Sequence, residues 1–173
     1  MHLVTCTHDR HAEAILDIFN EAILNSTALY DYTPRPLESM ADWFQQKAAA
    51  RYPVIGVEDD DGTLLGFASY GQFRVRPAYK YTVEHSVYIH RDHRGRGLGP
   101  LLMRRLIEEA MAQGYHVLVG GIDASNAASL RLHERLGFTH SGTIQQAGFK
   151  FGRWLDLAFY QLILSTPRDP RDG

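Results

Sequence analysis

Arg94-Gly95-Arg96-Gly97-Leu98-Gly99 joins an apolar segment, HSVYI at residues 85–89, to a segment with the periodicity of an amphipathic helix. Apolar residues recur at every fourth position from Leu98 to Ala110, which predicts a helix with one buried face. A glycine-rich turn that opens a helix leaves backbone N–H groups unpaired at the positive end of the helix dipole. The order of strand, glycine turn and helix therefore predicts an α/β chain that binds a phosphate group at residues 94–100.

The spacing of the glycines distinguishes between the known phosphate-binding motifs. A dinucleotide-binding fingerprint does not fit, because Pro100 stands where its third glycine would be, and a P-loop lacks its Gly-Lys-Ser/Thr. What remains, Arg94-x-x-Gly97-x-Gly99, resembles the pyrophosphate-binding pattern of the GNAT N-acetyltransferases. On this motif alone, a glycine turn that only begins a helix stays an open alternative.

A second segment, NAASLRLHERLGF at residues 126–138, resembles the other signature of that family, a short helix that ends in Leu-Gly-Phe. Helical spacing predicts that Ala128, Leu132 and Leu136 face the core and that His133 lies on another edge. Because both motifs occur in order, the chain is identified as a member of the GNAT superfamily. That resemblance implies a mixed central sheet flanked by helices, with acetyl-coenzyme A as the co-substrate.

Length and composition indicate one enzyme domain, at residues 1–165, followed by a polar and disordered tail at 166–173. The 173 residues are 45% hydrophobic and carry a formal net charge of −2, with no basic stripe for nucleic acid. No apolar run is long enough to span a membrane, and no signal peptide is recognisable, so we expect a cytoplasmic protein. Cys6 is the single cysteine, and we expect His8 and His11 to lie on a solvated helix face, so we predict no metal.

Elsewhere the sequence alternates predicted helices and strands. The turn at residues 59–62, DDDG, predicts a β-hairpin. We expect strands near residues 3–6, 53–58, 64–70, 81–89, 115–121, from 138 onward and at 155–164, and further helices near 9–24 and 37–50.

Acetyl transfer from a thioester needs one group that takes the amine proton and one that protonates the departing thiolate. Glu84, on the strand that leads to the glycine turn, is our candidate base, acting directly or through a water. His133 is our candidate acid, because histidine titrates near pH ~6.5. The alternatives, a solvent-facing strand residue and a surface histidine, stay open.

We expect backbone N–H groups after Glu84 to bind the thioester oxygen and the pantetheine arm. Asn126 is expected to contact the cofactor, to cap its helix, or both. The predicted cofactor-binding residues are Val87, Tyr88, Ile89, Arg94, Gly95, Arg96, Gly97, Leu98, Gly99, Pro100 and Asn126.

Closer comparison of TVEHSVY at 82–88 and GFKFGRWLDL at 148–157 shows a resemblance to the phosphinothricin and methionine sulfoximine N-acetyltransferases. It implies a homodimer that acetylates the α-amine of a small amino acid by direct attack in a ternary complex. Relatives usually carry tryptophan where this chain has Tyr30 and Phe73, which leaves the preferred amino acid open. The residues that the resemblance assigns to the substrate are Arg74, Val75, Arg76, Glu84, His85 and Ser86.

Two other functions stay open. A protein or peptide acetyltransferase would need an open groove, whereas Tyr30, Tyr32, Phe73 and Tyr79 favour the walls of a small pocket. A non-catalytic acyl-coenzyme A sensor would be expected to lack Glu84 or His133.

Overall fold

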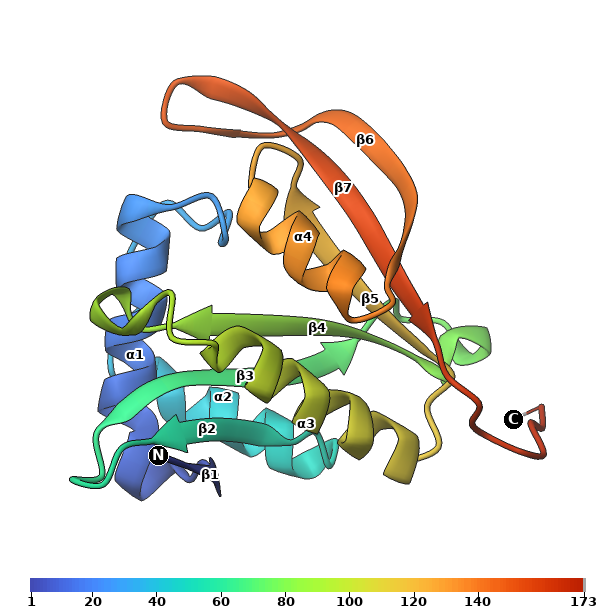
Figure 1. The fold of residues 1–173 in the computed structure, drawn as a ribbon, viewed down its shortest axis with the longest axis horizontal. Coiled ribbons are helices and arrows are strands. Elements are labelled where there is room, and N and C mark those ends of the chain that lie inside the picture. Colours follow the sequence, from blue (N-terminus) through green and yellow to red (C-terminus); the bar gives the residue numbers. More distant parts are fainter. Residues whose placement is uncertain (173) are drawn as a thin grey trace. The chain divides into compact units, whose positions relative to one another are not determined.

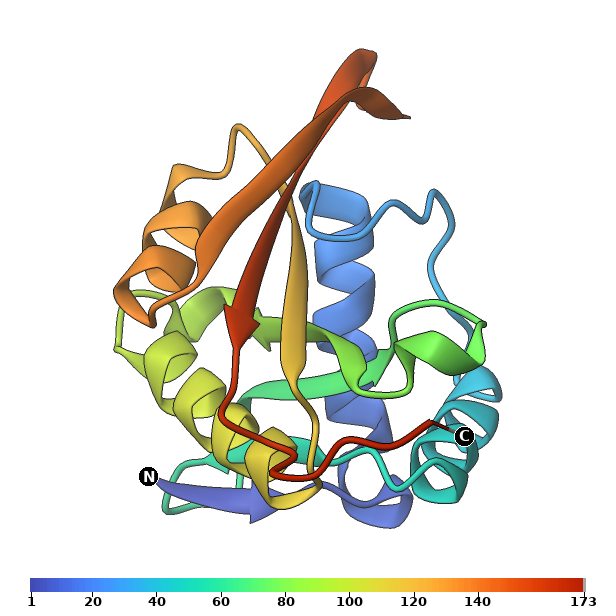
Figure 2. The same cartoon turned by 90° about the vertical axis from the view of Figure 1, so that its right-hand side faces the viewer.

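The computed structural model describes residues 1–172, which form two compact units (Figures 1 and 2). The first unit combines residues 1–69 with residues 86–106, and the second combines residues 70–85 with the chain from residue 107 onward. Strands β3 and β4 and helix α3 each pass from one unit into the other, so each unit holds part of all three.

In the first unit, β1, β2 and β3 form an antiparallel array covered by two helices. The predicted hairpin between β2 and β3 is confirmed: Gly62 has φ +81°, and the carboxylate of Asp59 accepts the N–H of Asp61 and Thr63. The elements are β1 (His2–Thr5), α1 (His8–Asn25), α2 (Ser39–Ala49), β2 (Val54–Glu58), β3 (Leu64–Gln72), β4 (Thr82–Ile89) and α3 (Leu98–Ala112).

The core of the first unit follows the sequence periodicity. Leu98, Leu102 and Leu106 of α3 are each at most 2% exposed, which confirms its predicted buried face. Phe19 of α1 packs edge to face on Phe67 of β3, with 5.1 Å between the ring centroids. Such contacts bury large apolar area and fix the helices against the strands.

The second unit contains a mixed sheet. β4 pairs with β5 in parallel, and β5 pairs with β7 and β7 with β6 antiparallel, so the order is β4-β5-β7-β6. Helix α4 lies against β5 and β7 on one face of these strands (Figures 1 and 2). The elements are β5 (Val117–Asp123), α4 (Ala127–Arg135), β6 (Thr139–Lys150) and β7 (Arg153–Ile163).

One prediction about α4 is wrong. Ala128 is exposed and Leu132 and Leu136 are only partly buried, whereas His133 is the buried residue of the helix, at 2% exposure. The helix therefore buries an imidazole where periodicity favoured aliphatic side chains. The reason is a polar partner on β4, described below, which satisfies the ring once it is buried.

The prediction for His11 is wrong as well. Its side chain is 2% exposed, and its Nε2 lies 2.9 Å from Oε1 of the buried Glu58. The chain after β7 contains no helix or strand up to residue 172. Thr166 and Arg171 nevertheless hydrogen-bond to Tyr115 and Tyr81 of the same unit. Disorder of this tail stays a prediction. Among residues 1–172, no helix combines the length and hydropathy needed to cross a bilayer.

Candidate active site

The glycine turn before α3 has the conformation that an anion site requires. Gly95 and Gly97 have φ of +77° and +76°, and a Cβ added at either would meet no atom within 4 Å. Glycine is therefore needed here for its left-handed backbone and not for lack of space. The Gly97 carbonyl accepts the N–H of Leu101, so the N–H groups of Leu98 and Gly99 fall in the first turn, where no intrahelical acceptor exists.

The arginines of this turn already have partners. Nη2 of Arg94 lies 2.7 Å from Oε2 of Glu21 on α1, although the arginine is 54% exposed. Nη1 of Arg96 lies 3.0 Å from Nδ1 of His93. Both side chains are thus oriented close to the turn, and contact of residues 94–100 with a phosphate stays a prediction.

The part of β4 assigned to the pantetheine arm lies beyond the strand's pairing with β5. That pairing runs from Thr82 to Glu84, and residues 87–89 follow it along the chain. On the other side, a Cβ at Gly66 of β3 would come 2.8 Å from the carbonyl oxygen of Tyr88, so β3 packs tightly there. Binding of an acyl donor along residues 87–89 stays a prediction.

Glu84 is half-buried on β4, beside the neighbouring strand. A Cβ at Gly121 of β5 would come 3.2 Å from Glu84 Oε1, a tight contact that glycine avoids. Burial raises the pKa of Glu84, and the positive charge of Arg74 opposes this increase. A partly desolvated carboxylate near a cation is suited to take a proton from an ammonium group.

His133 does not lie beside Glu84; it pairs with His85. The two Nε2 atoms are 2.8 Å apart, the ring centroids 5.0 Å apart, and both rings are buried. Side chains alternate along a strand, so Glu84 and His85 point to opposite faces. Gly121 accordingly contacts Glu84 while Gly120 contacts both histidines. The two predicted catalytic residues therefore lie on opposite faces of β4 and β5.

Sequence reasoning missed this histidine pair and the two glycines beside it. His85 was expected only as a substrate contact, and Gly120 and Gly121 were not singled out. The available signals were the period-two alternation around Glu84 and the adjacent glycines inside a buried strand, which mark a close approach of side chains.

Three of the six residues expected to bind the substrate, Arg74, Val75 and Arg76, line an open depression in the second unit, whereas Glu84, His85 and Ser86 do not. The depression measures about 630 Å³ and is walled by Phe73, Arg74, Val75, Arg76 and Tyr79. The Arg74 guanidinium lies 4.4 Å from the centre of the Phe73 ring, and Tyr79 packs edge-on against the same ring. Nη1 of Arg74 also donates to the Phe73 carbonyl at 2.8 Å, so the guanidinium is held beside this ring, where it could bind a carboxylate.

Two further candidates are exposed. Asn126 caps α4, since its Oδ1 accepts the N–H of Ser129 at 3.1 Å, and contact with a cofactor stays a prediction beside this structural role. Ser86 is exposed and is the first residue of β4 that belongs to the first unit. Within residues 1–172, no cluster of three or more His, Cys, Asp or Glu side chains is arranged to hold a metal ion.

The chain as a whole resembles known acetyltransferases. A family model described as the acetyltransferase (GNAT) family matches residues 13–138. The chain is 50% identical over 154 residues to an L-methionine sulfoximine/L-methionine sulfone acetyltransferase of Pseudomonas paraeruginosa, covering 89% of this chain and 90% of the relative. It is 37% identical over 158 residues to a phosphinothricin N-acetyltransferase of Streptomyces viridochromogenes, covering 91% and 85%.

A solved acetyltransferase from Salmonella typhimurium, crystallised with its cofactor acetyl-CoA, superimposes with a TM-score of 0.94 at 42% identity. The match covers 99% of this chain and 98% of that one.

Proposed function

The chain belongs to the acetyltransferase (GNAT) family, and we propose that it moves an acetyl group from acetyl-coenzyme A to the α-amine of a small amino acid or analogue. The relatives named for methionine sulfoximine, methionine sulfone and phosphinothricin suggest the substrate class. One observation carries the proposal: in the second unit a guanidinium lies beside two aromatic rings in an open depression, and its charge lowers the pKa of a half-buried carboxylate.

These two groups match the two charges of an amino acid. Arg74 would bind the α-carboxylate, as guanidinium groups do bidentately, and Glu84 would take a proton from the α-ammonium. The amine then attacks the thioester carbonyl, the N–C bond forms and the C–S bond breaks. Backbone N–H groups of residues 87–89 would bind the oxygen on which charge develops.

Acetyl-coenzyme A would lie along the end of β4 and the glycine turn. The unpaired N–H groups at the first turn of α3 fit a pyrophosphate, and the exposed Gly95 and Gly97 let it approach the backbone. Because this co-substrate is an intracellular metabolite, we also propose that the protein works in the cytoplasm.

The proposal is tested by measuring release of coenzyme A from acetyl-coenzyme A with a panel of amines. The panel holds L-methionine sulfoximine, L-methionine sulfone, phosphinothricin, the common amino acids and a lysine peptide. Turnover confined to the small amino acids supports it. Turnover on the peptide alone would instead assign protein acetylation, and binding of acetyl-coenzyme A without turnover would assign a sensor.

Arg74→Met is expected to raise KM for the amino acid about 10- to 100-fold, because one charge-assisted hydrogen-bond pair contributes ~1.5–3 kcal/mol. KM for acetyl-coenzyme A should not change, since none of the predicted cofactor-binding residues lines the depression at Arg74. Arg104→Met, at an exposed arginine of α3, is the control and should leave the KM for the amino acid unchanged. Equal effects of the two substitutions in initial-rate assays would contradict the specific role of Arg74.

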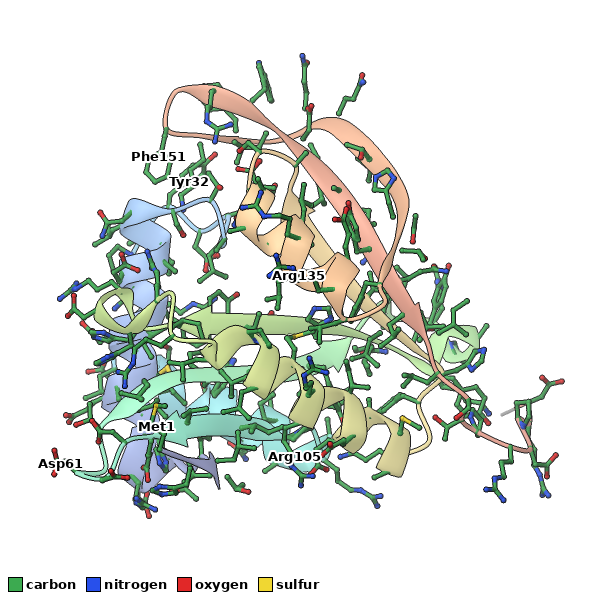
Figure 3. All side chains as sticks on the ribbon, viewed as in Figure 1. Met1, Tyr32, Asp61, Arg105, Arg135 and Phe151 are labelled. Atoms are coloured by element: carbon green, nitrogen blue, oxygen red, sulfur yellow. The ribbon has the colours of Figure 1, made fainter. Side chains whose placement is uncertain are left out.

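We propose that the protein is a homodimer that uses the hairpin of β6 and β7. Arg153 to Leu155 pair with β6, whereas the pairing of β7 with β5 begins only at Leu157. This end of the hairpin carries Phe149 and Trp154, in edge-on contact at 5.0 Å, and Phe151 at the turn (Figure 3). All three are 47–60% exposed, which is unusual for aromatic side chains outside an interface.

Trp154→Asp is expected to weaken the dimer at least ~30-fold, since a buried interface tryptophan commonly contributes more than ~2 kcal/mol. Sedimentation velocity at micromolar concentration should then show a monomer. Leu24→Asp, at an exposed apolar position of α1, is the control and should leave the mass unchanged. A monomeric wild-type protein would overturn the proposal.

A further inference from the structure

The pairing of His85 with His133 fixes where the protons of both rings reside. Nδ1 of His133 lies 2.7 Å from the backbone carbonyl of Ser129, one turn earlier in α4. A carbonyl oxygen only accepts, so His133 carries its proton on Nδ1. An uncharged imidazole has one N–H, which makes Nε2 of His133 an acceptor. The 2.8 Å contact between the Nε2 atoms therefore requires His85 to donate.

We propose that His85 is a positioning residue for His133: by donating its Nε2–H to Nε2 of His133, it holds His133 in one orientation, as the Nδ1–H tautomer and uncharged. The effect of this hydrogen bond on catalysis rests on the proposed acetyl transfer. The tautomer of His133 can be measured without any reaction.

The surroundings of the pair favour the uncharged state. His85 is 6% exposed and His133 2%, and Phe138 packs on both rings at 5.2 and 5.1 Å. Burial lowers the pKa of His85 to about 3, with His133 adding to the decrease and the Val119 backbone opposing it. Burial also lowers the pKa of His133, and the Ser129 carbonyl opposes that decrease.

Other titratable groups lie near the pair. Tyr160 of β7 has its ring 6.3 Å from His133, and its hydroxyl donates to Glu134 of α4 at 3.1 Å. His140 of β6 contacts Tyr160 on the same face, and Glu84 lies on the opposite face of β4. The described contacts thus bring no carboxylate against either imidazole.

The absence of a side chain at Gly120 makes room for the two imidazoles. A Cβ at this position would lie 2.9 Å from Cε1 of His85 and 3.0 Å from Nε2 of His133, closer than real Cβ contacts come. Both contacts are with atoms of imidazole rings that are hydrogen-bonded to each other. Neither ring can move away from a Cβ without disturbing the pair. Substitution of Gly120 should therefore separate the two imidazoles without removing either.

This arrangement changes the role expected of His133. As the N–C bond forms and the C–S bond breaks, the ammonium nitrogen gives up two protons and the thiolate takes one. Glu84 would accept the first. The second would pass to the thiolate, directly or through water. Nε2 of His133 holds no proton in this tautomer, and both rings lie on the face of β4 opposite Glu84, so His133 does not supply that proton and acts instead through the packing of β4 against β5 and α4.

The test reads the tautomers directly by long-range ¹H–¹⁵N correlation spectra of the imidazoles, in the full-length labelled protein without substrate. His133→Gln identifies the His133 signals. We expect a protonated Nδ1 on His133 and a protonated Nε2 on His85. His85→Gln, which keeps an N–H donor, should preserve the His133 tautomer. His85→Leu should give a mixture of tautomers, raise the titration midpoint of His133, and lower kcat at least about tenfold.

Protonation of Nε2 on His133 in the wild type, or an unchanged His133 spectrum in His85→Leu, would overturn the proposal. If His85→Leu fails to fold, Gly120→Ala provides the same comparison, since it should disturb the tautomer with both rings present. The spectra need no substrate, so failure of the amine panel leaves this result intact. A lower kcat with an unchanged tautomer would instead retain acetyl transfer and reject the positioning role.

Discussion

Replacing Glu84 with glutamine is expected to lower kcat/KM for the amino acid about 10²- to 10⁴-fold, the usual contribution of a general base. Glutamine keeps the length and shape of the side chain but cannot take a proton from the ammonium group. Because glutamine occupies nearly the same volume, it should fit beside Gly121 without moving the strand. Coenzyme A release measures the loss, and calorimetry should show unchanged binding of acetyl-coenzyme A.

The dependence of kcat/KM on pH provides a second test of Glu84 as the general base. The pKa of Glu84 is raised by burial and partly restored by Arg74. Only the ionised carboxylate accepts a proton, so kcat/KM should fall as the pH decreases through that raised pKa. Arg74→Met removes the opposing charge and should move this acidic limb to higher pH, whereas in Glu84→Gln the limb should vanish.

Glu13→Gln, at an exposed position on α1, is the matched control and should behave as wild type. If Glu84→Gln kept its rate within about threefold, the contribution expected of a general base would be absent. Another group would then accept the amine proton.

Most of the fold could be predicted because its signals are local. The ladder from Leu98 to Ala110 indicates α3, and the DDDG turn at 59–62 indicates the hairpin of β2 and β3. The glycine turn could be predicted for the same reason, since Gly95 and Gly97 adopt left-handed backbone that other residues avoid. For the majority of the helices and strands, the predicted boundaries differ from the observed ones by one or two residues.

The interior of the site could not be predicted in the same way, because its polar residues are buried by partners distant in sequence. His133 faces inward because His85, 48 residues earlier, offers a hydrogen bond. Periodicity treats histidine as polar and assigns it to the surface, so it chose Leu132 and Leu136 for the core of α4. The hydropathy pattern contains no information about which polar side chain finds a partner.

His11 illustrates the same principle in the first unit. The Thr7 N–H donates to its Nδ1 at 2.9 Å, so the proton lies on Nε2, which donates to Glu58 at 2.9 Å. Arg10 adds a contact of 3.0 Å to the same carboxylate. Burial raises the pKa of Glu58, but the His11 hydrogen bond and the Arg10 charge outweigh it, and the pKa falls below its usual value.

His11→Leu is expected to destabilise the protein by about 2 kcal/mol at pH 7, because a hydrogen bond to a charged group contributes ~1.5–3 kcal/mol and Arg10 remains beside the carboxylate. Leucine fills part of the space but leaves a carboxylate that is 3% exposed without its donor. Urea unfolding followed by circular dichroism measures the change in the free energy of unfolding. Glu13→Leu, at an exposed position on the same helix, should change it little.

The dependence on pH identifies the cause of that loss. A carboxyl whose pKa is depressed in the folded state stabilises the protein above its unfolded value of about 4.3 and ceases to do so as the pH falls through the folded value. The difference between wild type and His11→Leu should therefore be largest at neutral pH and shrink below about pH 4.5. Adding Glu58→Leu to His11→Leu should recover part of the lost stability, since apolar pairs often replace buried ion pairs at no cost. A loss that is independent of pH and persists in the double variant would mean that packing of the ring, and not its hydrogen bond to Glu58, stabilises this corner of the first unit.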